Sequence, residues 1–522
     1  MLKKLAYLSL PLWLVACGAG ATATPAVTPA TPGADAPADT AATDAAKKPV
    51  GLGEAPRGVP APDKACAAYH GPAGASCAKG DLTEQLAAAL SASDAERDQQ
   101  LRCLEQSPDA PPGLIRALRA DLAPRGCADL VVGTEASVPG AARDIADTLV
   151  ALGVGARLYR TVREAPLPRA PFDKAAFLKH FKEVLSPWIA AQAHAVDSLS
   201  QVGPRLNGYA KAVVALEAGL ADMRFVSVAR SIALPDEMKN DPEIKETYLV
   251  ALEQALEPRV ARGRDAALVG LGELSRQGIL TDARLRDARQ LLSELYAGRR
   301  IDALDRLLLP ALPALDTSGA ALKVAAKLPA FYSLKLAASP NVTDAKLLRA
   351  RLEQGVPPAL WLGEQPAAQP ELLLLAQRAL FQLGQTYFWA EPFNKAAALS
   401  VPAQDQNAAL VAALAKVLAK GPRNAAAMML GPPTLPAELR DTAALDALAK
   451  EKTPAAGLAE FDAAYVRGLA PPANDPAFWK EQAARYQRAQ KKLTDKAAQA
   501  SAAELAKAAQ DTEKELKKQP KP

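Results

Sequence analysis

The spacing of apolar residues restricts the fold of this chain more than any other feature of its sequence. From about residue 139 to residue 470, apolar side chains recur every three or four positions, which places them along one side of an α-helix. Proline and glycine divide this region into segments of helical length. Alternating patterns typical of strands are scarce, and the best of them, ADLVVGTEASV at 128–138, is short. The sequence therefore predicts an all-α, multi-helix array.

One segment, residues 171–199, shows the pattern clearly. Phe177 and Leu185 lie on a stripe that would be buried, and Asp173 is placed to cap the start of the helix. Pro187 lacks a backbone N–H, so it is expected either to kink this helix or to begin the next one.

A second segment carries clearer boundary signals. Asp241 is placed as an N-cap, and Pro242 occupies the first helical position, where its missing N–H costs nothing. Pro258 is expected to interrupt the run of helix, and Gly278 is expected to end the segment that follows. The sequence therefore predicts two successive helices here.

Length and charge exclude some classes of protein. At 522 residues the chain is too long for one ordinary hydrophobic core, so packed units or a repeat array are expected. Apolar residues make up 49% of the chain and charged residues 23%, which is a globular composition. The 62 Lys and Arg residues are interspersed with 57 Asp and Glu residues and form no concentrated basic face. We therefore expect no nucleic-acid partner.

The helical body loosely resembles helical-repeat proteins. Ala221, Phe225 and Pro235 stand roughly where the second helix of a tetratricopeptide repeat has such residues, and 264–274 looks like a second helix of the HEAT type. The tryptophan and Leu-Gly positions of a tetratricopeptide first helix are missing, and no fixed period flanks the HEAT-like segment. A degenerate α-solenoid and an irregular bundle therefore both fit the sequence.

The first 17 residues have the pattern of a signal peptide. Lys3 and Lys4 precede an apolar stretch that is too short to cross a bilayer as a helix. The residues that follow, Leu14 to Cys17, resemble the lipobox of bacterial lipoproteins. This resemblance implies cleavage before Cys17, a diacylglyceryl group on its sulfur, and in many members acylation of the new amino terminus. Gly18 stands where aspartate would suggest inner-membrane retention, so the resemblance favours an exported protein anchored by lipid in the outer membrane of the cell envelope.

The remainder of the chain divides by composition. Residues 18–64 are rich in Ala, Thr and Pro and poor in bulky apolar residues, which predicts a disordered tether. We expect a small helical module at 65–135, the helical body at 136–470, and a charged, alanine-rich helix or tail at 471–522. This tail is expected to be solvated and to dock only through three aromatic residues: Phe478, Trp479 and Tyr486.

Four cysteines cluster in the small module, at Cys66, Cys77, Cys103 and Cys127. In an oxidising compartment such a set predicts two disulfides, for which three connectivities are possible. Pairing in sequential order is favoured, because 66–77 encloses a turn-rich segment and the second pair would join two helices. A zinc site that includes His70 is the competing interpretation, but the paired C-x₂-C spacing of such sites is missing.

No catalytic, cofactor-binding or metal-ligating residue is predicted. His180 and His194 stand 14 positions apart, about 21 Å along one straight helix, which is too far to share a metal ion. Gly153 and Gly155 form a lone G-x-G that is more typical of a loop than of a nucleotide site.

These observations predict a membrane-anchored envelope lipoprotein that acts as a non-catalytic helical scaffold for protein–protein interaction. Its partners would be the membrane, through the lipid on Cys17, and an envelope protein or peptide, bound on a concave face that includes Tyr387, Phe388 and Trp389. The alternative is an envelope hydrolase whose acidic active site, two carboxyl groups in a cleft, is assembled from distant residues. A binder of soluble ligands would instead need one enclosed apolar pocket.

Overall fold

The computed structural model describes most of the chain: residues 52–56, 58–69, 79–134, 138–163, 166–169, 172–235, 239–336, 344–357, 360, 369–399, 405–421, 426–432 and 434–519. The predicted signal peptide with Cys17, the predicted tether as far as residue 51, and both Cys77 and His70 lie outside the described residues. Within these residues the chain forms 20 α-helices and no β-strand. The predicted all-α, multi-helix array is therefore confirmed.

The first helices build the part of the fold that contains the cysteines. They are α3 (Leu82–Ala89), α4 (Asp94–Leu104), α5 (Leu114–Leu122) and α6 (Ala128–Val132), with 3₁₀ turns η1 (Lys64–Tyr69) and η2 (Arg125–Cys127). The segment with the best strand pattern, 128–138, begins with the helix α6. Ala128, Val131 and Val132 are buried together on one side of this helix.

The longest helices follow and form one arm of the molecule. They are α7 (Arg143–Arg163), α8 (Lys174–His180), the π-helical turn η3 (Phe181–Leu185), α9 (Ser186–Val202), η4 (Gly203–Arg205), α10 (Gly208–Ser231), α12 (Pro242–Arg276) and α13 (Ala283–Leu295). Asp173 caps α8 through Ala176 N–H, as predicted, and Pro187 stands in the first turn of α9. Because α8, η3 and α9 follow one another without a gap, Pro187 lies within a continuous helical run, just after its π-helical turn.

The second half of the chain contains shorter helices and ends in a hairpin. They are α14 (Ala320–Lys327), α15 (Ala330–Leu336), α16 (Ala345–Leu352), α18 (Pro370–Tyr387), α19 (Ala390–Ala398), α20 (Gln406–Leu418), α21 (Ala443–Leu448), α22 (Ala455–Leu469), α23 (Pro476–Lys492) and α24 (Lys496–Lys518). Two 3₁₀ turns, η5 (Ala427–Leu430) and η6 (Ala437–Arg440), precede α21.

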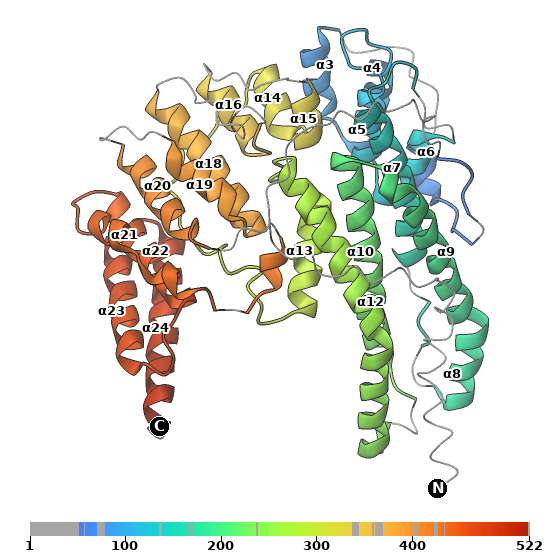
Figure 1. Ribbon diagram of the computed structural model, residues 1–522. Coiled ribbons are helices and arrows are strands. Elements are labelled where there is room, and N and C mark those ends of the chain that lie inside the picture. The colour runs from blue at the N-terminus through green and yellow to red at the C-terminus, as the bar shows by residue number, and fades with distance from the viewer. Residues whose placement is uncertain are drawn as a thin grey trace, which may run out of the picture.

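The helices form an arch (Figure 1). α3–α5 and α14–α16 lie at its top, α8–α12 form one arm, and α21–α24 form the other. One hydrophobic core continues through the array, with buried members from Leu52 to Ala506. The described helices range from 5 residues in α6 to 35 residues in α12, so the array is irregular.

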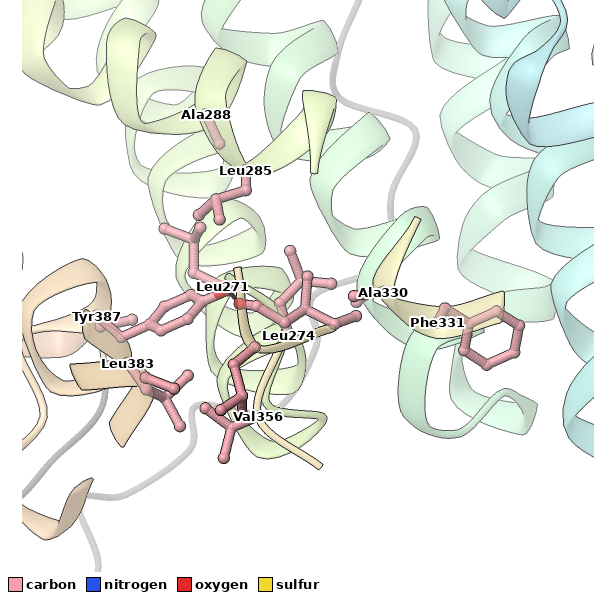
Figure 2. Packing of buried hydrophobic residues seen from close by; sticks show 14 of the residues in the cluster. Leu271, Leu274, Leu285, Ala288, Ala330, Phe331, Val356, Leu383 and Tyr387 are labelled. Carbon is pink, nitrogen blue, oxygen red and sulfur yellow. Dashed lines mark hydrogen bonds between the residues drawn. The ribbon is translucent and has the colours of Figure 1, made fainter. Parts of the chain in front are cut away.

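The two halves of the arch share the part of this core shown in Figure 2. Leu271 and Leu274 of α12 lie there with Leu383 and Tyr387 of α18. The Tyr387 hydroxyl also donates a 2.7 Å hydrogen bond to the carbonyl of Ile279, which follows α12. Tyr387 therefore joins the halves by both packing and a buried hydrogen bond.

The helix α12 corrects the prediction that Pro258 separates two helices. Asp241 caps the helix and Pro242 begins it, as predicted, but the helix continues through Pro258 to Arg276. The side chains of Leu252, Leu256 and Val260 are buried before and after the proline, in a small cluster shared with α9 and α10. Because this packing holds both sides of the interruption, the helix tolerates the loss of one backbone hydrogen bond.

The C-terminal tail corrects a second prediction. Phe478 and Tyr486 are buried, as expected, and Trp479 is half-buried. However, α24 is packed against α23, with four alanines buried along one stripe: Ala498, Ala502, Ala506 and Ala509. Small side chains let two helices approach closely. A stripe of alanines is therefore enough to pack α24 against α23, although its low hydropathy does not predict burial.

The pair α10 and α12 makes the closest helix contact. An added Cβ at Gly219 of α10 would lie 2.8 Å from the carbonyl oxygen of Gly263 and 2.8 Å from the backbone N of Ala267. Backbone atoms cannot rotate away as a side chain can. A glycine is therefore required at this position for the two helices to pack as they do.

We predict that Gly219→Ala destabilises the fold, whereas Gly272→Ala, on the partner helix, stabilises it. An added Cβ at residue 272 meets no atom within 4 Å. Overpacking should cost Gly219→Ala about 1–3 kcal/mol of unfolding free energy, and the better helix propensity of alanine should give Gly272→Ala about 0.5–1 kcal/mol. Chemical denaturation of the two variants measures the difference. Equal effects of the two substitutions would contradict the close packing.

Candidate functional site

The structure pairs Cys66 with Cys127, which corrects the predicted sequential pairing. The two Cα atoms lie 5.2 Å apart across a sequence separation of 61 residues, and both cysteines are buried. Cys103 is disulfide-bonded as well. Sequential pairing assumed that the shortest loops close first. Instead, α5 and η2 return the chain to the start of the module, and tertiary packing places Cys127 beside Cys66.

This disulfide fastens a segment that we call the N-terminal strap, residues 52–56 and 58–69. The strap runs along α7 and enters the module at η1. It is the first described part of the chain, and its residues up to 64 belong to the segment predicted to be a disordered tether; in the structure they are bound to α7. Any tension on an anchored N-terminus would therefore enter the folded body through the strap.

Arginines on α7 hold the strap by its backbone. Arg157 donates hydrogen bonds to the carbonyl oxygens of Leu52 (3.0 Å), Gly53 (2.7 Å) and Glu54 (3.1 Å). Arg160 donates one of 2.8 Å to the carbonyl of Pro60. A guanidinium has five N–H donors in a fixed plane, so it can bind several carbonyls at once.

The same arginines are fixed by a carboxylate on α6. Asp129 accepts hydrogen bonds of 2.7 and 2.8 Å from Arg160 and lies 3.6 Å from the Nε of Arg157. Further along α7, Arg163 forms an ion pair with Asp63 of the strap. The arginines therefore stand at every third position of one helix and bind one extended segment.

The glycines of the G-x-G pattern explain how the strap approaches α7. Gly153 and Gly155 lie in the middle of this helix, so the prediction of a loop is wrong. A Cβ at Gly153 would lie 2.6 Å from the side chain of Leu52, and one at Gly155 would lie 3.0 Å from the side chain of Glu217. Both glycines are therefore sites of close packing, one for the strap and one for α10.

The module clamps the other end of the strap. Arg119 donates to the Tyr69 carbonyl at 3.5 Å, and Arg102 donates to the carbonyl of Ala68. Asp98 accepts hydrogen bonds from both guanidinium groups, at 3.0 Å from Arg119 and 2.8 Å from Arg102. The strap is thus bound at both ends through arginines whose charge a buried aspartate balances.

A pocket of about 300 Å³ lies between the strap, α7 and the end of α9. Its lining includes buried Leu52 and the buried, charged Arg157, as well as the exposed side chains of Glu54, Gln201 and Arg205. This open and partly polar depression differs from the enclosed apolar pocket that a binder of soluble ligands requires.

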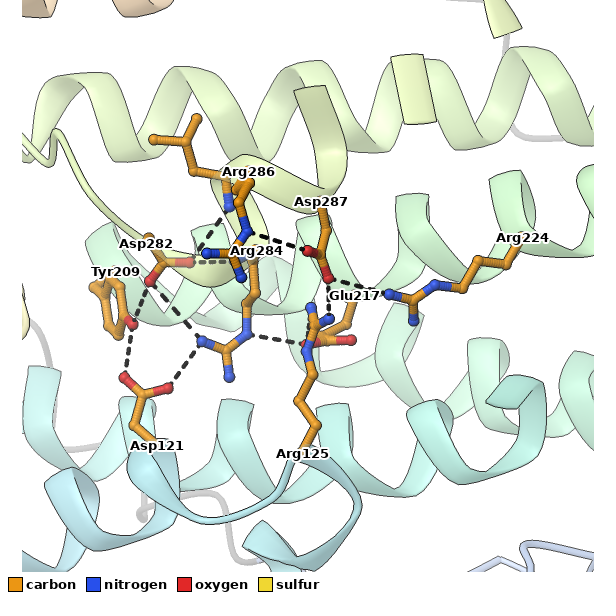
Figure 3. A network of polar contacts seen from close by, with 10 residues as sticks. Asp121, Arg125, Tyr209, Glu217, Arg224, Asp282, Arg284, Arg286 and Asp287 are labelled. Carbon is orange, nitrogen blue, oxygen red and sulfur yellow. Dashed lines mark hydrogen bonds and ion pairs between the residues drawn. The ribbon is translucent and has the colours of Figure 1, made fainter. Parts of the chain in front are cut away.

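A second cluster of charges lies at the junction of α5, α10, α13 and α15 (Figure 3). Arg284 donates to Asp121 at 2.8 Å and to Glu217 at 3.0 Å. Arg125 binds Glu217 at 3.0 Å and Asp287 at 2.6 Å. Burial alone would lower the pKa of Arg284, but Asp121 and the other nearby acidic groups raise it well above its ordinary value. The guanidinium is therefore a permanent cation that holds two carboxylates.

The junction also brings together a pair of buried acids, the kind of pair that the hydrolase alternative requires. Asp121 and Asp282 both lie within hydrogen-bond distance of the Tyr209 hydroxyl, at 2.8 and 3.0 Å. Their side chains are 6% and 8% exposed, and the pocket described above is lined by other residues. The pair is therefore enclosed by packed helices and does not open into that pocket.

The remaining predicted residues are dispersed. Tyr387 and Phe388 are buried, so the prediction that they form an exposed binding face is wrong; Trp389 is half-buried. The Nε2 atom of His180 lies 2.6 Å from the Pro166 carbonyl, and His194 is exposed on α9. No group of three His, Cys, Asp or Glu side chains within the described part of the chain is placed to hold a metal ion.

The sequence analysis missed the arginines of α7 and of the junction. Arg157 and Arg160 are buried in a helix that is buried on nearly every side. An arginine inside such an apolar helix is a signal of a buried polar partner, because an unpaired buried charge is very costly. The sequence could not indicate that the partner is a backbone segment 100 residues earlier.

No protein-family model, curated protein or solved structure matches this chain. Among the helices of the described residues, none is both long enough and apolar enough to span a bilayer.

We predict that Arg157→Ala releases the N-terminal strap. The change removes three hydrogen bonds to strap carbonyls, so residues 52–60 should exchange backbone hydrogen faster and become accessible to proteases. The control is Arg143→Ala on the same helix, where the side chain is 57% exposed and forms a 3.8 Å ion pair with Asp147. Hydrogen exchange measured by mass spectrometry distinguishes them. Unchanged protection of 52–60 in Arg157→Ala would refute the clamp.

Proposed function

We propose that this chain is an exported lipoprotein, anchored through lipid on Cys17 in the outer membrane of the cell envelope, and that its helical array is a non-catalytic scaffold for an envelope protein or peptide. The observation that carries the proposal is the leader ending at Cys17, followed at residues 52–69 by a strap bound along its length to the folded body.

The chemistry of the anchor supports a permanent attachment. Each buried CH₂ group contributes about 0.8 kcal/mol of membrane binding, so one acyl chain binds marginally and two or three bind firmly. The lipobox resemblance implies at least the two chains of a diacylglyceryl group. The disulfide between Cys66 and Cys127 is consistent with export, because disulfides persist in oxidising compartments.

The distribution of exposed apolar side chains supports a scaffold with one docking region. Within the described residues, all six exposed large apolar side chains lie between residues 167 and 269, on α12 and on or beside α8: Leu167, Leu178, Val184, Leu249, Val250 and Val269. Single exposed apolar residues are ordinary on protein surfaces, but all six belong to segments of one arm of the arch. We infer that this arm is where the partner docks.

The anchor is tested by Cys17→Ser in the full chain. We expect the variant to lose lipid modification, to retain its first sixteen residues, and to lose the hydrophobicity that partitions the wild type into detergent. Mass spectrometry of the purified protein and phase partitioning in detergent measure these changes. The control is Cys103→Ser, which removes another cysteine and should leave the lipid unchanged. Finding an unmodified thiol at Cys17 in the wild type would refute the anchor.

The docking region is tested by the double variant Leu249→Glu/Val250→Glu. Both side chains are exposed, at 44% and 53%, so the unfolding free energy should change by less than about 0.5 kcal/mol. Recovery of a specific crosslinked partner from detergent-solubilised envelope should fall at least tenfold. The matched control, Thr247→Glu/Gln254→Glu, adds the same charge to exposed polar positions of α12 and should retain the partner. Equal recovery from both double variants would exclude this arm.

A further inference from the structure

The junction of Figure 3 contains a chain of oxygen atoms that has too few hydroxyl protons. The hydroxyl of Tyr209 lies 2.8 Å from one oxygen of Asp121 and 3.0 Å from one oxygen of Asp282. Tyr209 carries a single hydroxyl proton, and an ionised carboxylate can only accept. If both acids were ionised, one of these two contacts would bring lone pairs together without a hydrogen bond.

The next hydroxyl in this series of oxygen atoms, that of Tyr332, supplies no spare proton. The Tyr332 hydroxyl lies 3.0 Å from the same oxygen of Asp121 and 3.0 Å from the carbonyl of Ala117. Its one proton is therefore committed to an acceptor on α5. One additional proton, on Asp121 or on Asp282, makes both contacts of Tyr209 hydrogen bonds.

The surroundings of the two acids decide where that proton lies. Asp121 accepts a 2.8 Å hydrogen bond from the guanidinium of Arg284 and contacts two phenols, so every one of these three partners can donate to it. The Asp282 oxygen that faces Tyr209 is 4.0 Å from the same guanidinium. The other Asp282 oxygen accepts from the backbone N–H groups of Arg284 and Leu285 as the cap of α13. Asp282 is therefore the acid that takes the proton.

The charge balance agrees with this assignment. Groups that face Asp282 come from five helices: Asp121 of α5, Tyr209 of α10, Arg284 of α13, Tyr332 of α15 and Tyr387 of α18. The anions Asp121, Glu217 and Asp287 already balance the cations Arg284, Arg125 and Arg224. An ionised Asp282 would add a buried negative charge without its own counter-ion.

We propose that Asp282 is a neutral carboxylic acid that donates its proton to Tyr209, which in turn donates to ionised Asp121. We propose further that these two hydrogen bonds form a pH-sensitive lock between α5, α10 and α13. These hydrogen bonds join Asp121 to Asp282, which is 161 positions later in the sequence. Loss of the proton leaves one contact unsatisfied and one buried charge uncompensated, which weakens the junction.

The raised pKa of Asp282 sets the direction in which stability changes with pH. Burial, and then the negative charge of Asp121, raise the pKa of Asp282 above its ordinary value of 3.8. An acid with a raised pKa in the folded state contributes its full stability below the ordinary value. That stability is lost as the pH rises from 3.8 through the raised pKa. Over this window the unfolding equilibrium constant can rise by at most about tenfold per pH unit for one proton.

The test compares Asp282→Asn with the wild type across this pH range. Asparagine keeps an oxygen to cap α13, and its amide N–H₂ can donate permanently to Tyr209. We expect the two proteins to be similarly stable near pH 4. We also expect the wild type to become at least tenfold more prone to unfold than Asp282→Asn as the pH rises. Other acids titrate in both proteins and cancel from the ratio of their unfolding constants.

Two further variants distinguish a proton shared between Asp282 and Tyr209 from the ordinary role of an aspartate as a helix N-cap. Asp241→Asn changes the cap of α12, where the aspartate accepts only backbone N–H groups, and should show no such pH-dependent ratio. Asp121→Asn removes the anion that binds Arg284 and should destabilise the protein at every pH. A ratio for Asp282→Asn that is constant with pH would overturn the proposal.

Infrared spectroscopy gives a readout that does not depend on the stability of any variant. The carbonyl absorption of buried protonated carboxyls at pH 4 to 6 should be smaller in Asp282→Asn than in the wild type by the contribution of one group. Asp462, whose pKa burial also raises well above its ordinary value, contributes equally in both proteins. If Asp282→Asn does not fold, titration of this band in Asp462→Asn, followed with ¹³C-labelled aspartate, replaces the comparison. Its absence from Asp462→Asn at pH 4 to 6 would show that both acids are ionised and would refute the lock.

Discussion

The guanidinium of Arg284 is the interaction on which the rest of this fold depends. It binds Asp121 of α5 and Glu217 of α10 from the first turn of α13, so one side chain fixes three helices that are distant in the sequence. Exchanging a buried ion pair for apolar side chains is often neutral in free energy, whereas removing one partner costs about 3–5 kcal/mol. Such a contact therefore contributes little to the total stability. Its contribution is to specify which helices meet and in which register.

The close packing of α7 connects this junction to the N-terminal strap. Gly155 leaves room for Glu217, which accepts from Arg284, and two residues earlier Gly153 leaves room for Leu52 of the strap. A side chain at either position would separate α7 from its neighbour. The short G-x-G pattern is thus a structural requirement of a helix that packs on two sides, and it needs no ligand to explain it.

Sequence reasoning recovered the features that are set locally. Asp173 and Asp241 cap helices because a cap depends on the next three residues alone. It failed where a distant segment decides the outcome. Pro258 remains inside a helix because α9 and α10 pack on both sides of it, and Tyr387 is buried because α12 lies opposite. The partner of Cys66 likewise depends on how α5 returns the chain. None of these contacts leaves a pattern within a window of helical length.

The placement of the strap and of the exposed apolar residues supports one division of labour in the function we propose. The strap binds α7, and the exposed side chains such as Leu178 and Leu249 lie in the arm that contains α8 and α12. Attachment and docking would therefore belong to the same half of the arch. In the described part of the other half, large apolar side chains are covered, and its core joins the first half through Tyr387. Because a docking surface is useful only if its shape persists, we infer that the second half serves as a buttress that holds the first in shape.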